Sequence, residues 1–162
     1  MPDIIQGFEP IFDVNSKVLI LGSFPSVKSR LINFYYGNRQ NRFWKMLCGY
    51  FGDSVPDNDV AKKKFLKAHA IALWDVVSEC EIIGSSDSKI RNYKIVDLSK
   101  ITGNCVLKTI LLNGTTAYRI FCERYRDIDI PFYLMPSTSP ANVRYKEGLW
   151  IEKFNTIFKG EL

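Results

Sequence analysis

Continuous apolar runs alternate with amphipathic stretches along this chain. Runs that are apolar at consecutive positions are typical of strands covered on both faces of a sheet. Four of them predict strands: 16–24 (SKVLILGSF), 70–77 (AIALWDVV), 106–114 (VLKTILLNG) and 130–140 (IPFYLMPSTSP, ending in a loop). Amphipathic periodicity predicts helices over 41–52, 59–70, 94–102, 115–125 and 147–160.

This alternation predicts an α/β fold with a parallel sheet. No repeat or linker divides the chain, so residues 1–162 are expected to form a single domain. The expected architecture is a three-layer α/β/α fold with a central, mainly parallel four-stranded sheet. Ligands bind such folds beyond the carboxyl ends of the strands. The segments expected there hold most of the small polar residues: 22–29 (GSFPSVKS), 74–80 (WDVVSEC), 112–117 (LNGTTA) and 135–142 (MPSTSPAN).

The composition indicates which class of protein this is, but says little about what it binds. The chain has 162 residues, of which 46% are hydrophobic and 14% aromatic, as in a folded globular protein. No apolar run approaches the roughly 20 residues of a membrane helix. The first residues lack the pattern of a secretory signal, so a cytoplasmic location is expected. A net charge of +5 suits a nucleic-acid partner and equally suits many other proteins.

Neither a metal nor a cofactor is expected. The four cysteines are dispersed, no CxxC pair is present, and the chain has one histidine. This spacing gives no support to a zinc or iron–sulfur site, and reduced, mostly buried thiols are the simpler interpretation.

The first and last of the four polar segments carry hydroxyl groups beside cations. Such groups hold phosphates, although Ser and Thr also cap helices and close turns. Phe24 falls just past the first strand, where an aromatic ring suits stacking on a base. Asp75 follows a buried strand, where an acid is costly unless it is paired, functional or a helix cap.

Taken in order, these segments resemble the uracil-DNA glycosylase superfamily over nearly the whole chain. GSFPS resembles its first motif, NRFWKML the helix that follows, and ALWD the strand whose last residue reads the base. LLNGTTA resembles the third strand and its turn, and MPSTSPAN the last motif, which inserts into DNA. YYGNRQNRFW and GSSDS are similar to the hypoxanthine-DNA (deoxyinosine) glycosylase branch.

Two departures from the superfamily bear on the mechanism that the resemblance implies. Phe24 stands where most members have the Asn that positions the attacking water, and Met135 stands where many have His or Asn. The hypoxanthine branch is expected to use an Asn of its YYGN segment, which maps to Asn38. Asn38 is therefore the expected catalytic residue, orienting water and stabilising charge on the sugar.

The resemblance implies a monomeric, monofunctional base-excision repair enzyme. It would flip a deaminated base out of DNA and hydrolyse the N-glycosidic bond. Ionised Asp75 would accept the N1–H of hypoxanthine, a donor that adenine lacks. The residues expected to bind the base are Ser23, Phe24, Tyr36, Asp75 and Asn113. Those expected to contact DNA are Ser26, Lys28, Ser29, Arg39, Asn41 (or a helix cap), Arg42, Ser137, Thr138, Ser139, Asn142 and Arg144.

Three alternatives stay open on the sequence. One is a glycosylase for uracil or mismatched bases, against which Phe24 and Met135 argue. Another is a non-catalytic module that binds damaged DNA. The last is a small domain that binds free nucleotides.

Overall fold

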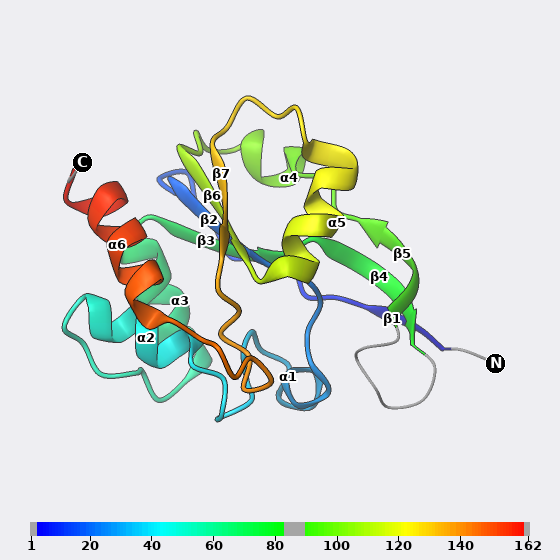
Figure 1. Ribbon diagram of the computed structural model, residues 1–162, viewed down its shortest axis with the longest axis horizontal. Coiled ribbons are helices and arrows are strands. Elements are labelled where there is room, and N and C mark those ends of the chain that lie inside the picture. Colours follow the sequence, from blue (N-terminus) through cyan, green and yellow to red (C-terminus); the bar gives the residue numbers. More distant parts are fainter. Residues whose placement is uncertain (1–2, 83–89, 161–162) are drawn as a thin grey trace.

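A four-stranded parallel sheet forms the centre of the protein (Figure 1). The computed structural model describes residues 3–82 and 90–160, so the GSSDS stretch, residues 84–88, lies outside the described residues. The strand order is β3-β2-β6-β7. The strands are β2 (Val18–Gly22), β3 (Ile71–Asp75), β6 (Thr109–Asn113) and β7 (Phe132–Met135). The predicted α/β/α fold with a parallel four-stranded sheet is confirmed.

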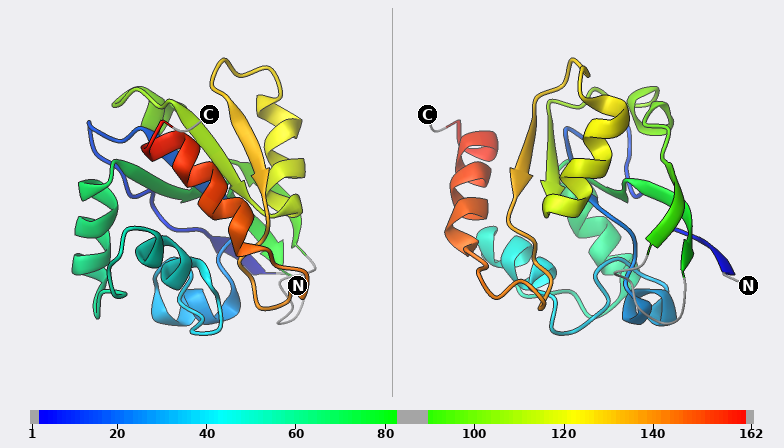
Figure 2. Two further views of the ribbon diagram at one scale, coloured as in Figure 1. Left: turned by 60° about the vertical axis from the view of Figure 1, so that its left-hand side comes forward. Right: turned by 45° about the vertical axis from the view of Figure 1, so that its right-hand side comes forward.

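Two groups of helices cover the two faces of this sheet (Figures 1 and 2). One face carries α2 (Phe43–Tyr50), α3 (Asp59–Ala68) and α6 (Glu147–Phe158). The other carries α5 (Thr115–Tyr125) and the short α4 (Ser99–Thr102). Every residue of β2 and β3 is buried, which explains why both strands read as uninterrupted apolar runs.

A second, antiparallel sheet follows directly from β3. Its order is β1-β4-β5, with β1 (Asp3–Gln6), β4 (Val77–Ile82) and β5 (Ile90–Ile95). The helix predicted over 94–102 is therefore wrong in its first part, because only Ser99–Thr102 is helical. The backbone there bonds to the sheet instead, and the N–H of Val96 donates to the carbonyl of Val76 at 2.8 Å.

One short helix near the site was not predicted. It is α1 (Val27–Ile32), which begins where the N–H of Ser29 donates to the Ser26 hydroxyl at 3.1 Å. Within the described residues, no helix is long and apolar enough to cross a membrane. The same residues contain no cluster of three or more His, Cys, Asp or Glu that could hold a metal ion.

Candidate active site

The carboxyl ends of the four parallel strands meet around one cavity of about 210 Å³. The strand register places Gly22 beside Asp75 and Asn113 beside Met135. We call this space the central cavity. It is lined by Gly22, Ser23, Phe24, Pro25, Ser26, Ser29, Tyr35, Tyr36, Asn41, Asp75, Asn113, Ser137, Thr138 and Ser139. All five residues that the sequence suggested for base binding therefore lie together.

Asp75 is the one acidic side chain that lines the central cavity in the described part of the chain. Its exposed fraction is 5%, and its Oδ2 atom is occluded with no hydrogen-bond partner among the described residues. Burial raises the pKa of this carboxyl group from 3.8 to about 7. Neutral and ionised forms of Asp75 are therefore both accessible near neutral pH.

Tyr36 forms the floor of the cavity next to Asp75. Its backbone has a φ of 52°, a left-handed conformation that residues other than Gly rarely adopt. Stacking on Phe43, with ring centroids 4.1 Å apart, stabilises this placement. Burial, and then the charge of Asp75, raise the pKa of the Tyr36 phenol, so the phenol stays neutral.

Asn113 joins this floor to the loop after β7. Its Nδ2 donates to the Tyr36 hydroxyl at 3.2 Å and to Thr138 Oγ1 at 3.0 Å. The N–H of Thr138 returns a bond to Asn113 Oδ1 at 3.0 Å. Both ends of the Asn113 amide are thus engaged, which fixes its orientation and holds two walls of the cavity together.

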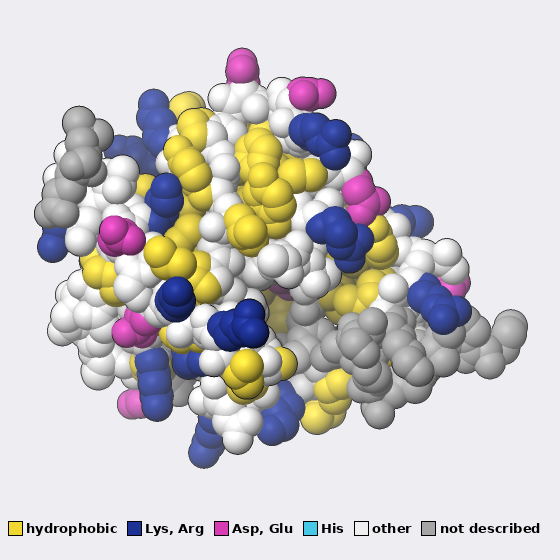
Figure 3. All heavy atoms as spheres, in the orientation of Figure 1, with side chains coloured by type: hydrophobic (Ala, Val, Ile, Leu, Met, Phe, Trp, Pro, Cys, Tyr) yellow, Lys and Arg dark blue, Asp and Glu magenta, His cyan; other side chains and the backbone are white. Residues whose placement is uncertain are grey.

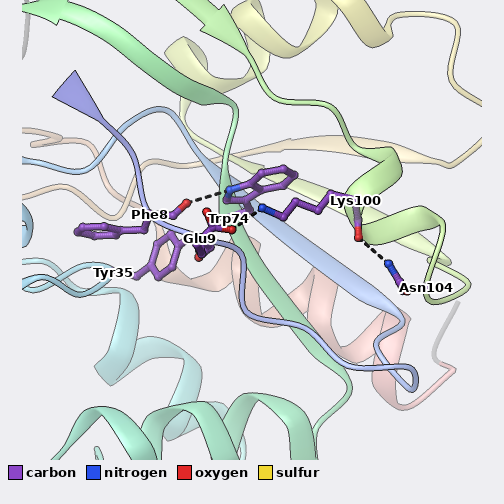
Figure 4. Close-up of polar contacts among 6 residues, drawn as sticks. All are labelled: Phe8, Glu9, Tyr35, Trp74, Lys100 and Asn104. Atoms are coloured by element: carbon purple, nitrogen blue, oxygen red, sulfur yellow. Dashed lines mark hydrogen bonds and ion pairs between the residues drawn. The ribbon is translucent and has the colours of Figure 1, made fainter. Parts of the chain in front are cut away.

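The N-terminal segment is bonded to Tyr35 of the cavity lining and to Trp74 of β3, and Figure 4 shows the residues involved. The hydroxyl of Tyr35 donates to the carbonyl of Glu9 at 2.7 Å, and the indole N–H of Trp74 donates to the carbonyl of Phe8 at 3.1 Å. The Glu9 carboxylate is paired with Lys100. Tyr35 was not among the residues expected at the site, although it adjoins Tyr36 in the same predicted loop.

Asn38, the expected catalytic residue, does not line the central cavity. Its Oδ1 accepts from the N–H of Gln40 at 3.0 Å, and it borders a neighbouring hollow, which shares Tyr36 and Asn41 with the central cavity and is also lined by Lys45 and Lys62. Asn41 from the same loop does line the central cavity. Its Oδ1 accepts from the N–H of Phe43, the first residue of α2, at 2.9 Å, although the residue that caps the helix is Arg42 and not Asn41.

Eight of the eleven expected DNA contacts have side chains that form hydrogen bonds within the protein, and Ser29, Thr138 and Arg42 are the most deeply engaged of them. Ser29, 3% exposed, accepts the N–H of Gly37 at 2.9 Å, while Thr138 is fully buried against Asn113. Arg42 donates to the carbonyls of Thr138 and Asn142 at 3.3 and 2.9 Å. The hydroxyls of Ser29 and Thr138 are therefore buried away from a phosphate, and the Arg42 guanidinium already uses its Nε and Nη2 donors inside the protein.

Arg42 in fact holds the whole loop between β7 and α6. Its guanidinium also donates to the carbonyl of Ser139 at 2.5 Å and lies 4.1 Å from the ring centroid of Tyr145. The loop that carries Asn41 and the loop that carries Ser137 are thereby locked to each other. Such a fork of donors is a geometry that Lys cannot reproduce.

A groove of about 580 Å³ adjoins the central cavity and shares Ser23, Asn113, Ser137 and Ser139 with it. Asn142 and the start of α5 line its far side. Lys28, Arg39 and Arg144, the remaining expected DNA contacts, are exposed. Figure 3 shows Lys and Arg side chains spread over the face that also carries β7 and α5. Cations beside a groove suit a polyanion.

Comparison with known proteins bears out the family resemblance. The family model of the uracil DNA glycosylase superfamily matches residues 9–159. A protein of Methanosarcina acetivorans named hypoxanthine DNA glycosylase is 36% identical over 147 residues, which span 90% of this chain and 92% of that protein. A protein of the same name from Methanosarcina barkeri is 36% identical over 154 residues, 92% of this chain and 97% of that protein.

A solved structure shows the same fold. The solution NMR structure of a candidate uracil DNA glycosylase from Methanosarcina acetivorans matches with a TM-score of 0.81 and 35% identity. The match covers 96% of this chain and 99% of that one. The chain belongs to the uracil-DNA glycosylase superfamily.

Proposed function

We propose that this protein is a DNA glycosylase that removes hypoxanthine from deoxyinosine in DNA by hydrolysing the N-glycosidic bond. The central cavity carries the proposal, because it combines an aromatic wall, Phe24, with one buried carboxyl group, Asp75. Both relatives at 36% identity are named hypoxanthine DNA glycosylase. A monomer acting as one domain over residues 1–162 stays a prediction.

A flipped base would enter the central cavity from the adjacent groove. Phe24 would stack on the base, which has a π-face whatever its substituents. Asp75 would form a hydrogen bond to the edge of the base and so contribute to its selection. Tyr36 and Asn113 shape the floor, because their hydrogen bond fixes the position of the phenol below the bound base.

Water for the hydrolysis would be oriented by an amide in the loop before α2. The sequence suggested Asn38, and the geometry favours Asn41, since only Asn41 lines the cavity that holds Asp75. The Asn41 Oδ1 accepts the N–H of Phe43, which leaves Nδ2 as the end of the amide that would face the cavity. An amide held in place at one end can orient a water molecule with the other.

The DNA strand would lie along the groove that adjoins the cavity. Exposed Lys28, Arg39 and Arg144 would contact its phosphates. The side chain of Asn142 donates to the carbonyl of Ser137 at 2.9 Å, which shapes the tip of the loop. Next to it, Val143 is 92% exposed and would fill the space that the flipped nucleotide leaves.

A uracil glycosylase is the second candidate function. Met135, at the position where many superfamily members carry a polar group, is 3% exposed and lines the groove rather than the cavity. Met135 and Phe24 therefore offer uracil no polar contact. A module that binds damaged DNA without cutting it is the third candidate.

Base release from matched oligonucleotides tests these candidates. Duplexes carrying one deoxyinosine, one deoxyuridine or only normal bases would be incubated with excess protein, and alkali would then cleave any abasic site. Scission of the deoxyinosine strand alone is the expected result. Scission mainly at deoxyuridine would favour the second candidate, and tight binding without scission would favour the third.

A further inference from the structure

The described structure places no cation and few donors where they could stabilise a negative charge on the carboxyl group of Asp75. It is 5% exposed, and its occluded Oδ2 receives no hydrogen bond from any described residue. No Lys, Arg or His lines the central cavity in the described part of the chain. A buried carboxylate normally receives several donors or a cation, and without them the neutral acid is the favoured form.

The residues that line the central cavity with Asp75 in the described structure carry no other charged side chain. The segment before α2 contributes the phenols of Tyr35 and Tyr36, whose pKa values burial and the charge of Asp75 both raise. The ends of β2 and β6 and the loop after β7 contribute residues without a titratable side chain: Gly22, Ser23, Asn113, Ser137, Thr138 and Ser139. Asp75 is thus the group in this cavity that can exchange a proton near neutral pH.

We infer that Asp75 enters the reaction as a neutral carboxylic acid and transfers its proton to the departing purine. This inference rests on the proposed glycosylase function. It differs from the expectation raised by the sequence, in which ionised Asp75 accepts the N1–H of hypoxanthine. Asp75 lines the cavity that would hold the base, so its proton can reach a ring nitrogen without an intermediary.

The proposed step balances with water as the only co-reactant. The bond between C1′ and N9 breaks, and its electron pair moves onto the purine. The Asp75 proton neutralises the purine as the pair arrives, and hypoxanthine leaves as a neutral base. Water attacks C1′ and loses a proton, which restores the acid form of Asp75. Protonating a poor leaving group lowers the barrier most when no cation or oxyanion donor can hold the charge instead.

The pH dependence of excision distinguishes whether Asp75 acts as a neutral acid or as an ionised carboxylate. Single-turnover release of hypoxanthine would be followed from about pH 5 to about pH 9, and acid catalysis predicts a plateau at low pH and a fall of about tenfold per unit above about pH 7. Asp75→Asn is expected to be about 100-fold slower or more, and to lose this profile. A rate that rises through neutral pH, or an Asn variant as fast as the wild type, would overturn the inference.

Two further measurements keep a structural role of Asp75 apart from a catalytic one. An oligonucleotide carrying the 2′-fluoro analogue of deoxyinosine, which resists excision, should bind Asp75→Asn at most about tenfold more weakly than the wild type, the effect of one hydrogen bond to the base. The infrared C=O band of a protonated carboxylic acid should be present in the free wild type at mildly acidic pH and absent from the variant. Absence of that band from the wild type would refute the acid form.

The site of protonation can be tested with 7-deaza-2′-deoxyinosine, in which carbon replaces N7. If N7 receives the proton, the wild type binds this oligonucleotide but releases its base at least about 100-fold more slowly. Equal rates for both purines would overturn transfer to N7. Failure to release hypoxanthine at any pH would refute the proposed glycosylase function together with this inference, whereas release with an inverted pH profile would refute only the inference.

Discussion

Gly22 and Asp75 lie so close that a Cβ atom on Gly22 would be 2.5 Å from Asp75 Oδ1. The same atom would be 2.9 Å from the hydroxyl of Tyr36. The contact arises because β2 and β3 are paired in register at their last residues. Absence of a side chain at this position lets the carboxyl group and the phenol share the floor of the central cavity.

Gly22→Ala is therefore expected to reduce deoxyinosine excision at least about tenfold and to destabilise the protein by about 1–3 kcal/mol, because the methyl group displaces Asp75 or Tyr36. Single-turnover excision and thermal unfolding measure the two effects. Gly49→Ala is the matched control, since a Cβ there has no neighbour within 4 Å and the residue lies within α2. That variant should keep full activity and gain about 0.5–1 kcal/mol of stability. A Gly22→Ala variant that excises hypoxanthine as fast as the wild type would mean that the packing of Asp75 against Tyr36 is not needed for excision.

The two asparagines of the loop before α2 are expected to differ in their effect on excision. Asn41→Ala should slow single-turnover excision by about 100-fold or more, because it removes the amide that lines the cavity. It also removes the hydrogen bond from the N–H of Phe43, worth about 1 kcal/mol, so Asn41→Asp, which keeps that acceptor, is the stability-matched variant. Asn38→Ala should retain excision within a few-fold. The reverse ranking would reinstate Asn38 as the residue that orients water.

Arg42 is expected to act on the loop rather than directly on DNA. Arg42→Met should lower the free energy of unfolding by about 1–3 kcal/mol, because it releases three backbone carbonyls and the ring of Tyr145. Arg42→Lys should recover little of this loss, since Lys lacks the planar fork. Exposed Arg39→Met is the control, with stability unchanged and weaker, less salt-dependent DNA binding. Identical behaviour of the two Met variants would contradict the structural role of Arg42.

The parallel sheet could be predicted because its strands have an unambiguous pattern. All five residues of β2 and of β3 are buried, so each reads as an apolar run with a polar segment after it. Strand β5 has no such pattern, because its residues are half-buried or exposed and half of them are polar or charged. Pairing with β4 forms this strand, and pairing between distant segments leaves little trace in a short stretch of sequence.

The location of the site could likewise be predicted, but not the orientation of each side chain in it. Asp75 and Asn113 each end a parallel strand, and both strands pair with β2, so both residues were expected at the carboxyl end of the sheet. Asn38 and Asn41 are separated by only three positions in an irregular loop, where no periodicity assigns side chains to a face. Ser29 and Thr138 were expected to contact phosphates through their hydroxyl groups, yet both hydroxyls are buried: that of Ser29 accepts the N–H of Gly37, and that of Thr138 accepts from the side chain of Asn113.

The free energy of unfolding is expected to fall with rising pH because of Asp75. Its pKa lies near 3.8 in an unfolded chain and about 7 in the folded protein, so between these values the folded state holds the extra proton. Stability contributed by the neutral acid is therefore complete at low pH and is lost progressively up to about pH 7, by an amount on the order of 4 kcal/mol. Asp75→Asn should remove this loss, because an amide of the same shape does not ionise. Denaturant unfolding of both proteins at about pH 5.5 and about pH 8.5 should show a stability advantage of the variant that grows with pH. Parallel pH profiles would mean that Asp75 ionises as readily in the folded protein as in the unfolded chain, with a donor that the described residues do not supply.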